Sequence, residues 1–165
     1  MYYIIIQESK GSVVDEQNID IEFLILADLA QVIGGKLHMM GGGWDRINVQ
    51  NFPHIQSFSI ATAISVPWAH TNEKHNIMIT MVDEDGQQEL FKIEGEFEVG
   101  RAPGIKPGSS QRLMMAFTVN SLKFSEPKVY SIISFIDGQE IRRLEFNVIP
   151  TPVLQAKMSN QQQSA

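Results

Sequence analysis

Two of the four histidines lie close enough in the sequence to share a metal ion. His70 and His75 are separated by a short polar stretch that contains Glu73, and imidazole and carboxylate groups are common zinc ligands. The sequence has no HExxH motif, which would place two histidines on one face of a helix. A polar loop exposed to solvent is the favoured interpretation, so the sequence predicts neither a metal centre nor a cofactor.

Two acidic turns form a second group of side chains with possible chemistry. Asp83, Asp85 and Asp137 could share a calcium ion between the turns, but calcium takes roughly six to eight oxygen ligands and no EF-hand loop is present. Both turns contain Asp-Gly, a common dipeptide of two-residue hairpins. We interpret them as plain hairpin turns and keep calcium as the alternative.

The motifs of several enzyme classes are missing from the sequence. The chain has no cysteine, which excludes thiolate metal sites and a cysteine nucleophile. No serine lies in a GxSxG motif. Gly35 and Lys36 are followed by Leu37, where a phosphate-binding loop needs Ser or Thr. The sequence therefore predicts a protein that is not an enzyme.

Trp44, Asp45, Trp68 and Arg101 are the candidate residues for a ligand or partner surface. Trp68 follows the end of a predicted strand, and Arg101 opens a long loop rich in glycine and proline. If these loops meet at one end of the domain, they present an aromatic and basic surface. The alternative is that both tryptophans pack in the core, because an indole brings a large apolar area.

Strands are the elements that must position these residues. An apolar run over residues 22–30 has large side chains on both faces, which is typical of a strand buried on both sides. Gly34 and Gly35 predict a two-residue hairpin turn, with residues 36–40 as the return strand. The three glycines at 41–43 let the backbone bend or approach another strand closely.

The rest of the chain repeats this pattern of short strands and turns. Residues 56–66 alternate between large apolar side chains and small ones such as Ala61 and Ala63, which indicates a strand between its own core and a crowded outer surface. Further strands are predicted over residues 76–82, 89–99, 112–119, 129–136 and 140–149. Eight or nine strands without a helix predict an all-β, single-domain antiparallel β-sandwich of the Ig-like, Greek-key type over residues 21–150.

The two ends of the chain differ from this domain. Residues 1–20 are predicted to be an arm or an extra strand, and residues 2–6, from Tyr2 to Ile6, are a candidate for self-association. Residues 151–165 have the polar composition of a flexible tail. The start of the chain lacks the basic residues of a signal peptide, and no apolar run is long enough to span a bilayer. A soluble, cytoplasmic protein without membrane contact is expected.

The stretch ADLAQVIGGKLHMMGGGWD resembles an uncharacterised family of bacterial proteins with the signature AD-x-AQV-x-GGKL-x3-GGGWD. Similar stretches are VPWAHTNEKH, VDEDGQ, EGEFEVGRAPG and the closing DGQE, so the resemblance covers residues 21–149. It implies a small β-sandwich of unknown function and provides no catalytic or binding residues.

The net charge of −6 and the lack of a basic cluster argue against nucleic acid as a partner. The leading hypothesis is a non-enzymatic module for protein interaction or assembly, with a protein as partner. The alternative is a domain that binds a small ligand, such as a sugar or calcium, at Trp44, Trp68 and the acidic turn around Asp85.

Overall fold

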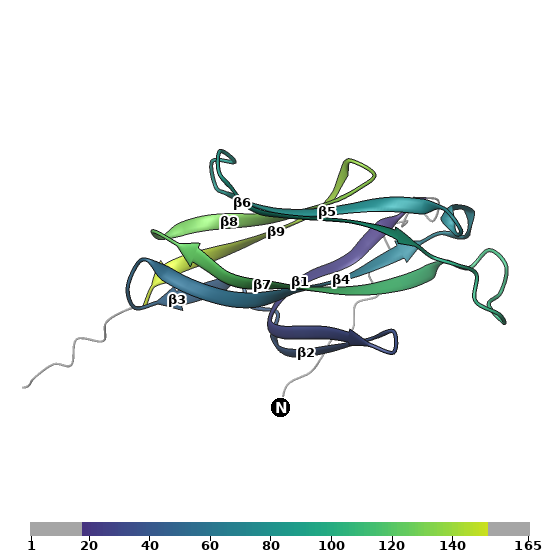
Figure 1. Ribbon diagram of the computed structural model, residues 1–165, viewed down its shortest axis with the longest axis horizontal. Coiled ribbons are helices and arrows are strands. Elements are labelled where there is room, and N and C mark those ends of the chain that lie inside the picture. Colours follow the sequence, from purple (N-terminus) through teal and green to yellow (C-terminus); the bar gives the residue numbers. More distant parts are fainter. Residues whose placement is uncertain (1–17, 152–165) are drawn as a thin grey trace, which may run out of the picture.

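A computed structural model describes residues 18–151, which form nine strands and one short 3-10 turn, η1 (Trp68–His70) (Figure 1). The described chain is all-β, as the sequence predicts, and its strands belong to two sheets. Sheet A has the strand order β2 (Lys36–Gly42), β1 (Asp20–Ile33), β4 (His54–Val66) and β7 (Gln111–Phe124). Sheet B has the order β3 (Arg46–Val49), β9 (Gln139–Pro150), β8 (Lys128–Ile136), β5 (Lys74–Asp83) and β6 (Glu89–Glu98).

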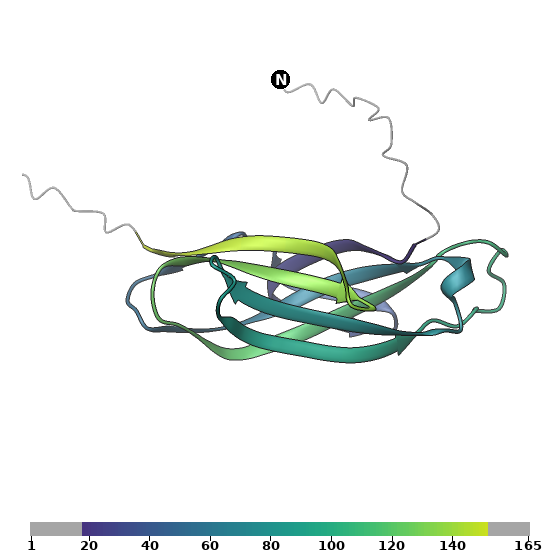
Figure 2. The ribbon, with the colours of Figure 1, turned by 90° about the horizontal axis from the view of Figure 1, so that it is seen from above.

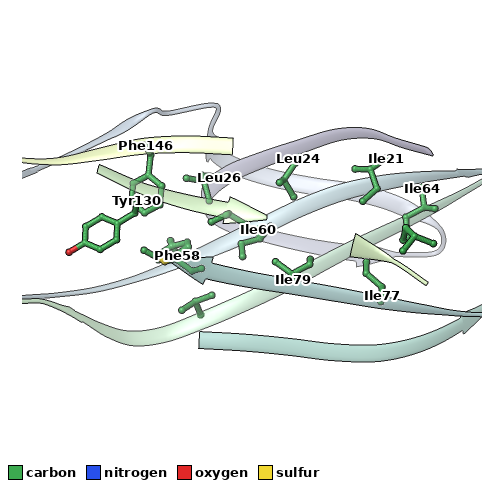
Figure 3. Packing of buried hydrophobic residues seen from close by; sticks show 14 of the residues in the cluster. Ile21, Leu24, Leu26, Phe58, Ile60, Ile64, Ile77, Ile79, Tyr130 and Phe146 are labelled. Atoms are coloured by element: carbon green, nitrogen blue, oxygen red, sulfur yellow. The ribbon is translucent and has the colours of Figure 1, made fainter. Parts of the chain in front are cut away.

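The two sheets face each other across one apolar core, and sheet B lies in front of sheet A when seen from above (Figure 2). Apolar side chains alternate along the strands and point between the sheets, which is how a strand with one inward face buries its side chains. Figure 3 shows Phe58, Tyr130 and Phe146 gathered at one end of this core, and Ile21, Ile64 and Ile77 at the other. Within residues 18–151, no helix is long and apolar enough to cross a membrane.

All three predicted tight turns occur where the sequence places them. Gly34 and Gly35 both have positive φ, at +57° and +73°, and join β1 to β2. The Asp-Gly turns at Gly86 and Gly138 join β5 to β6 and β8 to β9. Positive φ in hairpin turns matches the right-handed twist of the flanking strands.

One strand and one pairing differ from the prediction. β3 pairs in parallel with β9, with Arg46 opposite Asn147, so the sheets are not purely antiparallel. With four residues, β3 is too short for its sequence to show a period. It is also not joined to β9 by a hairpin, so no tight turn forces an antiparallel arrangement.

The β1–β2 hairpin forms a partial third layer over the outer face of sheet A. β1 and β2 both contact β7, although β4 separates β1 from β7 in the sheet, and β2 lies below the other strands in Figure 1. Ala30 and Leu37 of the hairpin pack with Ala61 of β4 and Ala116 of β7. The outer surface of β4, which the sequence predicts to be crowded, is therefore the surface on which this hairpin packs. We call this surface, with Ala61 and Ala116, the seat of the hairpin; only small side chains fit there.

Two predictions fall outside the described residues. The arm over residues 1–20, including the proposed self-association through residues 2–6, concerns mainly residues that the structure does not describe. The flexible tail over residues 151–165 is described only at Thr151, whose N–H donates to the carbonyl oxygen of Val49 at 2.8 Å.

Candidate functional site

A buried histidine lies where two loops meet at one end of the sheets. His75, the second residue of β5, is 5% exposed. Its Nδ1 lies 2.8 Å from Oδ2 of Asp137, and its Nε2 lies 3.1 Å from the carbonyl oxygen of His70. Because both oxygens are acceptors, both contacts are hydrogen bonds when both ring nitrogens carry protons, and His75 then forms an ion pair with Asp137.

The electrostatics agree with this ion pair. Burial is the largest influence on the pKa of His75 and lowers it, but the hydrogen bonds with Asp137 and the His70 carbonyl and the charges of Asp137 and Glu73 outweigh burial and raise the pKa. The backbone N–H of Asn76, which donates to Oδ1 of Asp137 at 2.8 Å, lowers the pKa of Asp137 most; burial opposes it and His75 assists it. Asp137 thus holds His75 in one orientation.

His70 and Glu73 complete a cluster around His75. One ligand atom of each of these three side chains lies within 4.8 Å of the other two. Nδ1 of His70 is 3.6 Å from Oε2 of Glu73, and the His70 and His75 rings meet nearly edge to face with centroids 5.9 Å apart. A cavity of about 280 Å³ adjoins the cluster and is lined by Asn18, Ile19, His70, His75, Ile136, Asp137, Gln139 and Ile141.

Two of the four predicted surface residues meet at this same end. The guanidinium of Arg101 lies over the ring of Trp68, 4.3 Å from the ring centroid. Arg101 also donates from Nε to Oγ1 of Thr71 at 2.7 Å, and from Nη2 to the carbonyl oxygen of Trp68 at 3.3 Å. Arg101 therefore ties the start of the long loop to η1, and this fixes the loop that carries His70 and Glu73.

Trp44 and Asp45 lie elsewhere, so the four predicted residues do not form one surface. Trp44 packs edge to face against Phe58 and Phe146, at centroid distances of 5.8 and 5.9 Å. Phe58, which Trp44 contacts, precedes Trp68 by ten residues. Ten residues span about 33 Å along an extended strand, so the two tryptophans lie far apart. The indole N–H of Trp44 is buried without a hydrogen-bond acceptor among the described residues, and Asp45 pairs with Arg46 in solvent at 2.9 Å.

The three acids of the possible calcium site do not come together either. Asp137 contacts the start of β5 at His75 and Asn76, whereas Asp83 ends that strand about 23 Å away. Oδ1 of Asp83 accepts from the backbone N–H groups of Gln87 and Gln88, at 3.1 and 3.2 Å. The plain-turn interpretation fits this geometry.

Asp83 provides a test of acid stability. The N–H of Gln88 lowers the pKa of Asp83 most; burial opposes this, and Lys128 and Gln87 lower the pKa further. A carboxyl group with a lowered pKa stabilises the fold above its unfolded value of about 3.9, and this stabilisation is lost as the pH falls through the folded value. Asp83→Asn should therefore lower the free energy of unfolding at about pH 6, and the difference from the unmodified protein should shrink at about pH 3. Urea unfolding at both pH values measures it, and a difference independent of pH would contradict the assignment.

The outer face of the β1–β2 hairpin is a surface that the sequence prediction missed. The cross-strand pairs Leu29–Met40, Gln31–His38 and Ile33–Lys36 share this face, and Met40 is 68% exposed and Ile33 58% exposed. A shallow cavity of about 290 Å³ is lined by Leu29, Gln31, His38, Met39 and Met40. The prediction that residues 22–30 are buried on both sides is wrong at Leu29, because the chain leaves the sheet core near Asp28 and turns one face to solvent.

Among residues 18–151, β2 is also the least protected of the four strands at the edges of the sheets. Edge strands usually carry charges that prevent pairing with other chains. β6 has exposed Glu94, Glu96 and Glu98 along its length, β3 has only four residues, and β7 carries Arg112 and Lys123. On β2 the one charged residue is Lys36, beside the turn.

Comparison with known proteins identifies a family but no activity. No curated protein matches the chain. A Pseudomonas fluorescens alkylpurine DNA glycosylase, AlkC, bound to DNA containing an abasic site analogue, matches with a TM-score of 0.39 and 12% identity. The match covers 79% of this chain and 30% of the glycosylase chain, and a similarity this low carries no argument about function. The model of a family of unknown function, DUF6941, matches residues 22–149, which is most of the chain, and the protein therefore belongs to that family.

Proposed function

We propose that this chain is a non-enzymatic protein-interaction module that assembles through the outer face and free edge of its β1–β2 hairpin. The observation that carries the proposal is the position of the exposed apolar side chains. Of the six large apolar residues exposed in the described chain, four belong to this hairpin: Leu29, Ile33 and Met40 share the outer face, and Met39, paired with Ala30, lies on the other face. Apolar side chains gathered at a free strand edge are typical of a binding surface rather than of solvated surface.

The occupant that fits this surface best is a second copy of the chain. Residues 29–42 contain one lysine and no acid, although the whole chain has a net charge of −6. Two copies that meet at their hairpins therefore keep most of their acidic residues apart. An antiparallel pairing of β2 with the partner's β2, centred on His38, places Lys36 opposite Met40 and joins two apolar faces about a two-fold axis.

The proposal also covers the location of the protein and the type of its fold. We place the protein in the cytoplasm, because a chain without cysteine suits a reducing compartment. We also class its two sheets as an Ig-like, Greek-key sandwich. A sugar- or calcium-binding domain has less support, because Trp44 and Trp68 lie far apart and the acidic turns do not converge.

Light scattering after size-exclusion chromatography, over a range of protein concentrations, tests the assembly. We expect the full chain to form a dimer and His38→Glu to be monomeric, because a pairing centred on His38 sets this position opposite itself and two carboxylates directly opposite each other repel. Ile55→Glu is the matched control, since Ile55 is 63% exposed but lies outside the hairpin. That variant should remain dimeric.

Deletion of residues 1–17 separates this surface from the self-association predicted for residues 2–6. The shortened chain should also remain dimeric if the hairpin is the contact. A full chain that is monomeric at every concentration, a dimer that survives His38→Glu, or a dimer lost only on the deletion would each reject the hairpin interface.

A further inference from the structure

We propose that His70, Glu73 and His75 bind a divalent transition metal ion of the zinc class at the end of the sheets opposite Trp44. This site is independent of the hairpin surface. It shares no residue with the hairpin: its ligands come from the segment between β4 and β5 and from the start of β5, and Asp137, which contacts His75, comes from the turn between β8 and β9.

The donor set selects the type of metal. Two imidazoles and one carboxylate suit zinc and its neighbours, whereas calcium and magnesium prefer oxygen ligands alone. Zinc binds such atoms at about 2.0–2.2 Å, so tetrahedral ligands lie roughly 3.4 Å apart. The three ligand atoms lie within 4.8 Å of one another and must approach by a little over 1 Å. The side chains of His70 and Glu73 are 36% and 58% exposed and have room to make this movement.

His75 is already oriented as a metal ligand. A histidine that binds a metal commonly donates its other ring N–H to a carboxylate, which fixes the tautomer and the ring. Nδ1 of His75 makes this bond with Asp137, and the N–H of Asn76 holds the same carboxylate. Nε2 then faces the loop, where it donates to the carbonyl oxygen of His70. The metal ion would replace the Nε2 proton and break that one hydrogen bond.

The local backbone brings the two histidines together. η1 ends at His70, and Asn72 has a positive φ of +62°, which reverses the chain before β5 begins. Asparagine tolerates this conformation better than most residues. The N–H of Asn72 donates to the carbonyl oxygen of Val99 at 2.8 Å, so the turn is anchored to the sheet. With three protein ligands, the fourth coordination position opens to solvent.

The experiment is a calorimetric titration of the full chain with zinc, after a chelator has removed any bound metal. We expect one zinc ion per chain, no comparable heat with magnesium, and the visible absorption of tetrahedral coordination when cobalt(II) is used instead. His70→Ala and Glu73→Gln should abolish binding, because each removes one of three ligands. Asp137→Asn should weaken it by about 10- to 100-fold, as expected for a carboxylate that orients a ligand.

His54→Ala is the matched control and should bind zinc as the unmodified chain does, because His54 contacts Gln56 on β4 and lies outside the cluster. Circular dichroism of the metal-free variants checks folding; Glu73 is exposed and His70 is half-buried. No zinc binding by the folded full chain, or equal binding by His70→Ala, would overturn the proposal. The hairpin interface would be unaffected by either outcome, since His38→Glu tests it separately.

Discussion

Replacing Phe146 with alanine should lower the free energy of unfolding by about 3–5 kcal/mol. Phe146 is 0% exposed and lies at the centre of an aromatic cluster formed by both sheets. Its ring centroid is 5.8 Å from that of Tyr130, 6.2 Å from that of Phe58 and 5.9 Å from that of Trp44. Alanine would remove the contacts to these three rings and to Phe124, whose centroid is 6.4 Å away, and leave a cavity between the two sheets.

Urea unfolding followed by fluorescence measures this loss, because the midpoint and the slope give the free energy of unfolding. A domain typically has only about 5–15 kcal/mol in total, so the alanine variant should unfold at much lower urea. Phe146→Leu is the matched control; it keeps most of the volume and should cost clearly less. A loss below about 1 kcal/mol for Phe146→Ala would show that this end of the core is not tightly packed.

Replacing Gly41 with alanine should cost about 2–3 kcal/mol, from two separate causes. Gly41 has a φ of +57°, which disfavours any residue with a Cβ atom. The new Cβ would also overlap the carboxylate of Asp28 on the neighbouring strand. Gly41 lies where the hairpin leaves sheet A, so the substitution should disturb the seat of the hairpin rather than the main core.

Gly34→Ala separates the two causes. Gly34 has the same φ of +57°, but a Cβ there would meet nothing within 4 Å. This control should cost about 1 kcal/mol, from the backbone conformation alone. The double variant Gly41→Ala with Asp28→Ala removes the carboxylate that the new Cβ would overlap. Its loss in the free energy of unfolding should therefore fall to that of Gly34→Ala. Equal losses for Gly34→Ala and Gly41→Ala would mean that the overlap with Asp28 is relieved at no cost.

Much of the strand pattern was predictable because it depends on local rules. Alternation along β4 and β5 and the glycines at Gly34, Gly86 and Gly138 mark strands and turns without reference to distant residues. β3 could not be found in this way, because its four residues pair with a strand about 100 positions later. The exposed face at Leu29 also escaped prediction, because it depends on where the hairpin folds back.

The candidate metal site was also predictable only where it depends on local sequence. The sequence spacing brought His70, Glu73 and His75 to attention as a possible zinc site. Asp137, which orients His75, lies 62 residues away and was assigned to a calcium alternative instead. A side chain that acts on another through space leaves no local signature, so only the fold could join Asp137 to His75.

The hairpin over sheet A has a consequence for the order in which the chain folds. The hairpin can form early, because only a two-residue turn separates Ile33 from Lys36 and closing so short a loop is fast. Its seat contains Ala61 and Ala116, which come from strands that pair across more than fifty residues. Leu37 therefore has no apolar surface to bury against until β4 and β7 have joined. We infer that the hairpin is among the first elements to form and the last to dock.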